Sequence, residues 1–229
     1  MKVTTDSCLF GAWVAQEIQS FIPQNETRNI LDIGTGTGLL SLMIAQKNQE
    51  VAIDAIEIDN MAALQAKENV LASGWKKKIN VIEADVKLFG LKGLYDIILS
   101  NPPFYEDDLV SPDPKKKVAH HDEGLLLEEL LVIIKKNLKI NGKFFLLSSN
   151  KRQKELEKLF TRHELFITEK LFVRQTEIHP ITRLIISGST SGAEKIITSQ
   201  ISIRDNKQQY TPEFRTLLED YYLNFETSI

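Results

Sequence analysis

The residues best suited to chemistry form the run Ser100-Asn101-Pro102-Pro103-Phe104, which follows an apolar stretch typical of a buried strand. Two consecutive prolines remove two backbone donors and fix two φ angles, so the carbonyl groups of this turn face whatever lies beside it. Asn101 adds an amide oxygen that can accept a hydrogen bond, and Phe104 adds a flat apolar face. Two acceptors and a ring suit a planar group that carries an NH2. The run therefore predicts a binding site for a planar amine.

A second motif, Asp32-Ile33-Gly34-Thr35-Gly36-Thr37-Gly38, lies between a short apolar strand and an amphipathic helix. Glycines at alternate positions let the backbone turn sharply and come close to a ligand. The dinucleotide fingerprint is Gly-x-Gly-x-x-Gly, but here the third glycine comes one residue early and Leu39 stands in its place. Asp32 would repel a pyrophosphate and attract a cationic amino group. The motif therefore favours a nucleoside with an amino acid tail, such as S-adenosylmethionine.

Two further acids follow predicted strands. Glu57 ends the strand after the glycine motif, about twenty residues on, where an acid usually receives ribose hydroxyl groups. Asp85 follows a third strand and can accept a hydrogen bond from the exocyclic amine of an adenine. Ile58 and Val86, each next to one of these acids, are further candidate cofactor contacts. Ligands of open α/β sheets bind at the carboxyl ends of the strands, so all of these residues are expected at one edge.

These motifs resemble those of the class I S-adenosylmethionine-dependent methyltransferases that act on planar nitrogens. Within that class, the chain resembles the bacterial enzymes that methylate N6 of the adenosine just 3′ of the anticodon in a valine tRNA. The residues that carry this resemblance are Met1 to Trp13, Asp32 to Leu40, Ser100 to Tyr105, Ile203-Arg204 and Gln209-Tyr210-Thr211. Such proteins usually carry a short aromatic and basic segment before the Met1-Lys2-Val3 run, so this chain is expected to be shortened at its N-terminus.

Together, the motifs and the resemblance predict a methyltransferase with S-adenosylmethionine as cofactor and a tRNA as partner. The predicted catalytic residues are Asn101, Pro102, Pro103 and Phe104, and the predicted cofactor-binding residues are Asp32, Gly34, Thr35, Gly36, Gly38, Glu57, Ile58, Asp85 and Val86. The Asn101 side-chain oxygen and the Pro102 carbonyl would accept the two amine hydrogens, so positioning replaces a strong base. Asn-Pro-Pro-aromatic motifs also serve enzymes that methylate release-factor glutamines or the guanine N2 of ribosomal RNA. A non-catalytic nucleotide-binding module is disfavoured, because both motifs are intact.

The formal net charge of −3 argues against a broad electrostatic footprint for nucleic acid, so RNA would have to bind to a local patch. The predicted patch is Lys115, Lys116 and Lys117 with Tyr105, just after the proline motif. The other candidates are Lys76-Lys77-Lys78 and the more distant Arg152, Arg162, Arg174 and Arg183.

The alternation of strands and helices predicts an α/β, Rossmann-like class I methyltransferase fold. We expect a seven-stranded, mostly parallel sheet with helices on both faces and a terminal antiparallel hairpin at 165–174 and 182–187. A single domain is predicted: residues 1–25 as an N-terminal helical lid, 28–150 as the cofactor-binding core and 151–229 as the part that completes the sheet. Asn141-Gly142 is expected to form a turn. One cysteine and four scattered histidines predict neither an internal disulfide nor a metal site. No membrane-spanning run or signal peptide is visible, and a cytoplasmic monomer is predicted.

Overall fold

A computed structural model describes residues 3–21, 26–91, 93–102, 126–192 and 195–225. The predicted site residues Pro103, Phe104 and Tyr105 and the predicted RNA patch Lys115 to Lys117 lie outside the described residues.

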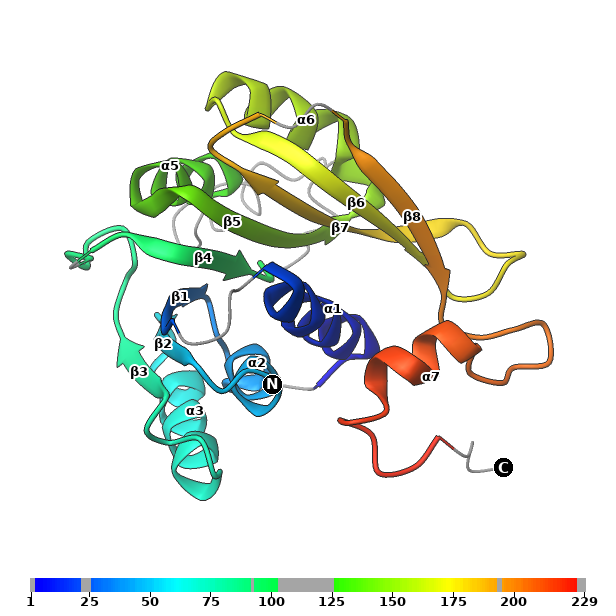
Figure 1. Ribbon diagram of the computed structural model, residues 1–229, viewed down its shortest axis with the longest axis horizontal. Coiled ribbons are helices and arrows are strands. Elements are labelled where there is room, and N and C mark those ends of the chain that lie inside the picture. The colour runs from blue at the N-terminus through cyan, green and yellow to red at the C-terminus, as the bar shows by residue number, and fades with distance from the viewer. Residues whose placement is uncertain (1–2, 22–25, 92, 103–125, 193–194, 226–229) are drawn as a thin grey trace, which may run out of the picture.

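Among the described residues, eight strands form one sheet in the order β3 (Ile79–Glu83), β2 (Val51–Glu57), β1 (Arg28–Ile33), β4 (Tyr95–Ser100), β5 (Leu138–Ser149), β7 (Ile181–Ser189), β6 (Phe166–Arg174) and β8 (Ile197–Ser202) (Figure 1). The strands from β3 to β5 are mutually parallel. β7 runs antiparallel to both β5 and β6, whereas β8 pairs with β6 in parallel. The predicted α/β fold with a mostly parallel sheet and an antiparallel β6–β7 hairpin is confirmed.

The strand count differs from the prediction of seven, because β8 adds an eighth strand. β8 lies at the edge of the sheet, and its first four residues are exposed. Such a strand lacks the alternation of buried and exposed positions that predicts a strand from sequence. One sheet thus joins the predicted core of residues 28–150 to the segment 151–229. The predicted division of the chain into three parts stays a prediction.

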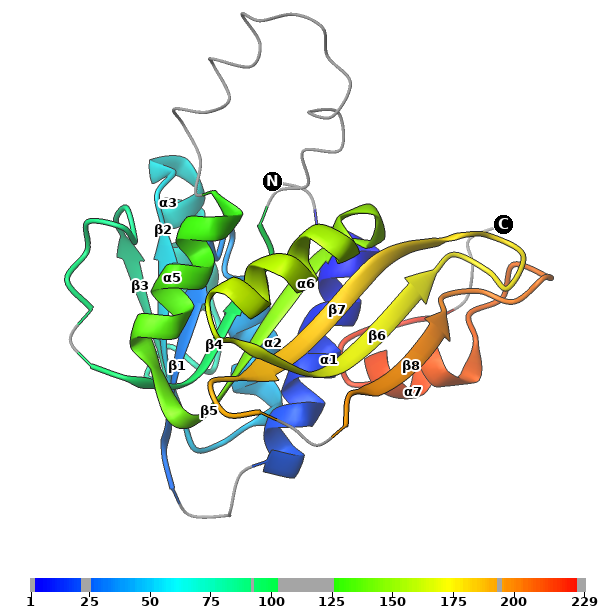
Figure 2. The same ribbon diagram turned by 90° about the horizontal axis from the view of Figure 1, so that it is seen from above.

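Helices cover both faces of the sheet, as Figures 1 and 2 show. The apolar side chains of the strands alternate between the two faces; in β4, Ile97 and Leu99 join one core cluster and Ile98 joins the other. The helices on the first face are α1 (Thr5–Phe21), α2 (Leu39–Lys47), α3 (Asn60–Ala72) and α7 (Pro212–Leu218); those on the second are α5 (Leu127–Asn137) and α6 (Gln153–Arg162), the latter preceded by the short 3-10 helix η1 (Asn150–Arg152).

The predicted N-terminal helix is present as α1, and it is part of the core. Leu9, Phe10, Val14 and Ile18 of this helix are fully buried between the sheet and its neighbours. A helix with several fully buried apolar side chains is anchored strongly, since each buried large side chain contributes roughly 1.5–3 kcal/mol. The prediction that residues 1–25 form a lid over a cofactor stays a prediction. None of the helices in the described ranges is both long and apolar enough to cross a membrane.

Side chains cap the N-termini of α3 and α7, and one local prediction, the turn before β5, is wrong. Asp59 caps α3 by accepting from the Ala62 N–H, and Thr211 caps α7 by accepting from the Phe214 N–H. Asn141-Gly142 lies within β5 instead of forming a separate turn before it. The pairing with β4 nevertheless jumps from Leu138 to Lys143 while β4 advances only from Tyr95 to Ile97, so β5 bulges at this point.

Candidate active site

Four strand ends meet at one edge of the sheet. In the register of the strands, Glu57 of β2 lies opposite Glu83 of β3, and Ile33 of β1 lies opposite both Ile56 of β2 and Ser100 of β4. One predicted site element lies at or just beyond each of these ends: Asp85 after β3, Glu57 in β2, the glycine loop after β1 and Asn101 after β4. In Figure 2 the arrowheads of β2 and β3 point to the top of the view, which is the edge where these strands end. The described members of the predicted site are therefore brought to a common edge.

The glycine loop needs its glycines. Gly34, Gly36 and Gly38 have φ values of 71°, 59° and 82°, which L side chains rarely adopt. The N–H groups of Gly34 and Thr35 donate to the carbonyl of Ile56 at 2.9 and 3.0 Å, which ties the loop to β2. A Cβ atom built on Gly34 would meet nothing within 4 Å, so open space lies beside the backbone there. A ligand can therefore come close to the backbone of the loop at Gly34.

Asp32 carries a buried carboxyl group, and one of its oxygens has no hydrogen-bond partner among the described residues. Its Oδ2 accepts hydrogen bonds from the hydroxyl groups of Thr35 and Ser41, both at 2.7 Å. Its Oδ1 is buried and has no partner among the described residues. Burial raises the pKa of Asp32 to about 6, and the negative charge of Glu57 adds to this shift. A buried carboxylate oxygen without a partner is costly, and a cationic donor such as the ammonium group of an amino acid tail would satisfy it.

Glu57 is fixed between the glycine loop and α3. Its Oε2 accepts from the Gly36 N–H at 2.8 Å, and its Oε1 accepts from the Asp59 N–H at 2.9 Å. Each carboxylate oxygen has a second lone pair, so Glu57 can still accept from two hydroxyl groups of a ribose. The next residue, Ile58, is 60% exposed and presents an apolar face at the same edge. This pair matches the polar and apolar halves of a nucleoside.

At the third strand end, the predicted residues Asp85 and Val86 both have contacts within the fold. Asp85 begins a turn, and its Oδ1 accepts from the Lys87 N–H at 2.9 Å. Its carboxylate therefore has a local structural task beside any contact with an adenine. The side chain of Val86 is buried in the core cluster on the second face of the sheet. A cofactor contact by Val86 would consequently fall to its backbone.

Asn101 is oriented by a residue of α1. Its Nδ2 donates to Ser7 Oγ at 2.9 Å, while its Oδ1 is buried without a partner among the described residues. The Ser7 hydroxyl in turn lies 2.9 Å from that of Thr4. Ser100 fixes the strand end, because its hydroxyl donates to the Ile33 carbonyl at 2.9 Å, directly before the glycine loop. The amide thus presents an unused acceptor beside the loop, as an amine-binding asparagine requires. Pro102, the next residue, is half-buried.

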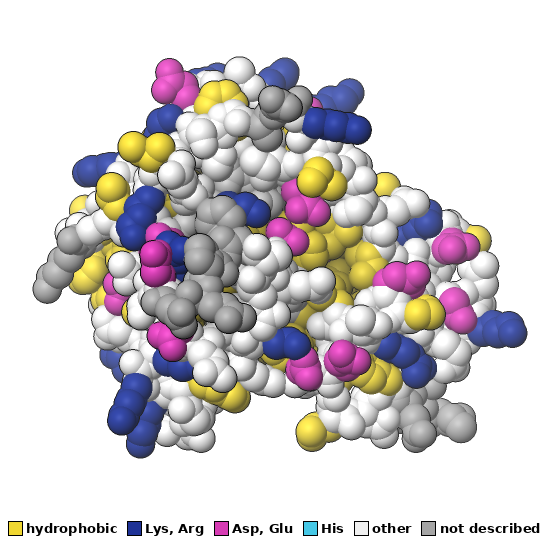
Figure 3. All heavy atoms as spheres, viewed as in Figure 1, with side chains coloured by type: hydrophobic (Ala, Val, Ile, Leu, Met, Phe, Trp, Pro, Cys, Tyr) yellow, Lys and Arg dark blue, Asp and Glu magenta, His cyan; other side chains and the backbone are white. Residues whose placement is uncertain are grey.

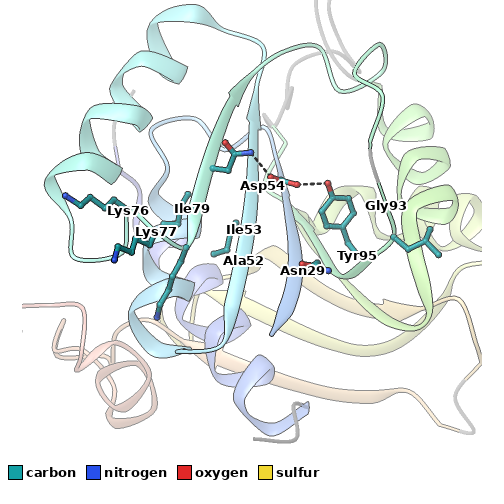
Figure 4. A pocket seen from close by; sticks show the side chains of 12 residues that line it. Asn29, Ala52, Ile53, Asp54, Lys76, Lys77, Ile79, Gly93 and Tyr95 are labelled. Carbon is teal, nitrogen blue, oxygen red and sulfur yellow. Dashed lines mark hydrogen bonds between the residues drawn. The ribbon is translucent and has the colours of Figure 1, made fainter. Parts of the chain in front are cut away.

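The basic candidates fall on two different edges. Lys76 and Lys77 line a hollow of about 500 Å³ near the amino ends of β2, β3 and β4, with Tyr95 donating to Asp54 on the far side of it (Figure 4). Lys78 donates to the backbone carbonyls of Ala45 and Asn48 at the C-terminal end of α2 and so supports the fold. This edge is opposite the glycine loop. By contrast, the register of the sheet brings Arg152, Arg174 and Arg183 to the edge that carries Asn101.

Sequence reasoning missed two residues of the site. Ser7 orients Asn101 across a separation of 94 residues, and Ser41 binds Asp32 from within α2. No local pattern marks either contact, because both depend on how helices pack on the sheet. Ser7 lies in the N-terminal run that carries the family resemblance, which is the single signal that pointed toward it.

Comparison with solved structures identifies the fold. An O-methyltransferase predicted in Agrobacterium tumefaciens superposes with a TM-score of 0.69 at 15% identity, covering 93% of this chain and 95% of that one. An S-adenosylmethionine-dependent methyltransferase from Aquifex aeolicus superposes with a TM-score of 0.57 at 14% identity, covering 82% of this chain and 94% of that one.

Sequence comparison goes further than the fold. The family model of the methyltransferase small domain matches residues 15–173. A tRNA1(Val) (adenine(37)-N6)-methyltransferase of Dyadobacter fermentans is 39% identical over 228 residues, which is 98% of this chain and 92% of the relative. Enzymes with the same name are 34% identical in Bacteroides thetaiotaomicron (99% of this chain, 92% of the relative) and 33% identical in Yersinia enterocolitica (98% and 87%). The chain therefore belongs to the methyltransferase small domain family and, within it, to the family of the tRNA1(Val) (adenine(37)-N6)-methyltransferases.

Proposed function

We propose that this protein transfers the methyl group of S-adenosylmethionine to N6 of adenine 37 in tRNA1(Val). The observation that carries the proposal is the buried, unpartnered Oδ1 of Asn101 at the strand end beside the glycine loop. An adenine N6 is a planar amine and can donate to that oxygen. The relatives that match this chain over nearly its whole length bear the name of this activity.

The residues at the sheet edge fit the cofactor. Asp32 Oδ1 would receive its ammonium group, the glycine loop would lie along its amino acid tail, and Glu57 would accept from its ribose hydroxyls. Ile58 and Asp85 would face its adenine. When bound, S-adenosylmethionine supplies an electrophilic methyl group on a sulfonium, so the protein needs no strong base.

Asn101 and its neighbour would act by positioning and by electrostatics. Asn101 Oδ1 accepts one hydrogen of the target amine, and the carbonyl of Pro102 accepts the other. These two contacts turn the nitrogen lone pair out of conjugation with the ring and aim it at the methyl group. They also stabilise the positive charge that develops on the nitrogen. As the N–C bond formed, the S–C bond would break with its electron pair left on sulfur, which becomes a neutral thioether, and the nitrogen would lose a proton to water. The stacking of the target base on Phe104 is a prediction that concerns a residue outside the described ranges.

Methyl transfer to purified tRNAs tests the proposal. The full chain is incubated with labelled S-adenosylmethionine and fractionated tRNAs, and the labelled RNA is digested and sequenced by mass spectrometry. We expect N6-methyladenosine at position 37 of tRNA1(Val), and no product from a transcript with guanosine at that position. Methylation of a release-factor glutamine or of guanine N2 in ribosomal RNA, without any methylation of tRNA, would show that the proposed substrate is wrong. The reaction class, transfer of a methyl group to a planar nitrogen, would still stand. A tRNA substrate would place the reaction in the cytoplasm, and the monomeric state stays a prediction.

A further inference from the structure

The edge that carries Asn101 continues across the second half of the sheet. Ser149 at the end of β5 lies opposite Arg183 of β7, and Arg174 at the end of β6 lies opposite both Ile181 of β7 and Ser202 of β8. Each of these four strands therefore has one end at this edge. An arginine stands at or just beyond each of these ends, and we call this set the arginine row: Arg152 after β5, Arg183 in β7, Arg174 in β6 and Arg204 after β8.

Each member of the arginine row is held in place by a neighbour. Arg183 pairs with Asp6 of α1 at 2.9 Å, and Arg152 pairs with Glu155 at 2.9 Å. Arg174 donates to the hydroxyl of Ser202 at 3.0 Å and to the carbonyl of Glu177 at 3.1 Å. The guanidinium of Arg204 lies 4.1 Å from the ring centroid of Tyr210. The row is therefore preorganised, so an incoming ligand need not order four long side chains.

The far end of the row keeps its positive charge. The contacts of Arg174 and Arg204 are to a hydroxyl, to carbonyls and to a ring, none of which neutralises a cation. Lys151 and Lys207, which flank the row, are exposed. Within the described ranges, no ion pair with a carboxylate is formed by Arg174, Arg204, Lys151 or Lys207. The nearby Asp205 accepts from the backbone N–H groups of Lys207 and Gln209 and so shapes the turn.

The basic residues of the opposite edge are mostly neutralised. Arg28 and Lys139 pair with the buried Asp96, and Lys143 pairs with Glu17. On the face shown in Figure 3, several of the Lys and Arg side chains likewise lie next to Asp or Glu side chains. Lys76 and Lys77 are exceptions: both are exposed, and neither forms an ion pair within the described ranges. They provide a matched control at the wrong edge.

We infer that the arginine row is the track on which the phosphate backbone of the RNA substrate lies as it reaches Asn101. This inference rests on the proposed function. Neighbouring strands lie about 4.8 Å apart, so four strand ends extend the site by roughly 14 Å, which is enough for several nucleotides. Guanidinium groups match phosphate geometry and bind it with charge-assisted hydrogen bonds. A local row of this kind lets a protein of net charge −3 bind a polyanion.

The test compares paired charge changes at the two edges. K151E/K207E reverses two exposed charges at the row, and K76E/K77E reverses two at the opposite edge; R174Q/R204Q removes two guanidinium groups from the row itself. For each full-length variant, the dissociation constant for tRNA1(Val) is measured across a range of salt concentrations. Calorimetry with S-adenosylmethionine and thermal unfolding show that the fold and the cofactor site are intact.

We expect K151E/K207E to weaken tRNA binding at least tenfold at low salt and to reduce the slope of log K against log salt by about 2, since each lost contact removes about one unit. R174Q/R204Q should act in the same direction, while K76E/K77E should match the wild type. Unchanged affinity and slope in R174Q/R204Q, with a wild type that methylates tRNA, would overturn the inference alone. A wild type that neither binds nor methylates tRNA would overturn both proposals. Salt-dependent RNA binding that R174Q/R204Q loses, without methylation of tRNA1(Val), would support the row and overturn the proposed substrate.

Discussion

Ser7 Oγ accepts a hydrogen bond from Asn101 Nδ2 at 2.9 Å, and this contact decides which end of the amide is left for a ligand. Because the NH2 end is occupied, the oxygen remains as a buried acceptor without a partner among the described residues. Ser7 is thus a positioning residue for the proposed reaction, although it touches neither substrate nor cofactor in our account.

Ser7→Ala tests this positioning. The variant loses one hydrogen bond, worth about 1 kcal/mol, so the side-chain amide of Asn101 can rotate and exchange its oxygen and nitrogen. The rate of methyl transfer should therefore fall about fivefold. The KM for tRNA and the affinity for S-adenosylmethionine should change little. Ser7→Thr keeps the hydroxyl and should restore most of the rate. Single-turnover kinetics separates these effects, and equal rates for wild type and Ser7→Ala would contradict the role.

Gly36→Val tests the glycine loop. Its φ of 59° is unfavourable for a β-branched residue, and the new side chain would stand where the cofactor tail is expected. Binding of S-adenosylmethionine should be lost, as followed by calorimetry. Gly74→Ala is the matched control, because a Cβ there meets nothing within 4 Å and the position has no positive φ. Cofactor binding by Gly36→Val would mean that the ligand lies elsewhere.

Asp32 predicts a pH dependence of cofactor affinity. Its pKa is raised to about 6, so the carboxyl group is ionised above that pH and neutral below it. An ammonium group binds the ionised form, so affinity for S-adenosylmethionine should rise with pH through about 6. It should fall again where the ammonium group loses its own proton, at about pH 8. Asp32→Asn should abolish the rise through about 6 and bind more weakly at about pH 7. A wild-type affinity that is flat with pH would show that Asp32 does not face the ammonium group.

The same raised pKa has a consequence for the protein without cofactor. A folded-state pKa of about 6 lies above the usual value for an aspartate, so the folded state holds a proton that the unfolded chain releases. This group favours folding below the unfolded pKa, and the contribution is lost as the pH rises through about 6. Saturating S-adenosylmethionine should reduce the loss. Denaturant unfolding at several pH values, with and without cofactor, measures this difference.

The sequence predicts those parts of the fold and site that depend on local patterns. Buried parallel strands appear as apolar runs, and Asp59 and Thr211 are recognisable helix caps because a cap acts within three residues. The common edge of Asp32, Glu57 and Asn101 follows from the rule that ligands bind at the carboxyl ends of parallel strands.

The rest depends on packing and register. β8 carries no apolar alternation, since it is an exposed edge strand. The contact of Ser7 with Asn101 joins residues that are 94 positions apart. Lys76 and Arg174 look alike in sequence as basic candidates, and the sheet register sends them to opposite edges. The edge strand, the Ser7–Asn101 contact and the edge on which each basic residue lies can therefore be known only from the three-dimensional structure.

The most direct test of the central claim is a single-turnover assay of wild type and Asn101→Ala on tRNA1(Val), with the methylated atom identified by mass spectrometry. We predict N6-methyladenosine at position 37 for the wild type. For Asn101→Ala we predict a rate lower by roughly a hundredfold, about 3 kcal/mol, by analogy with the loss of one preorganised hydrogen bond to a developing charge. The affinity of the variant for S-adenosylmethionine should equal that of the wild type. An undiminished rate in Asn101→Ala, or a methyl group on any other atom, would show that Asn101 does not position the target amine.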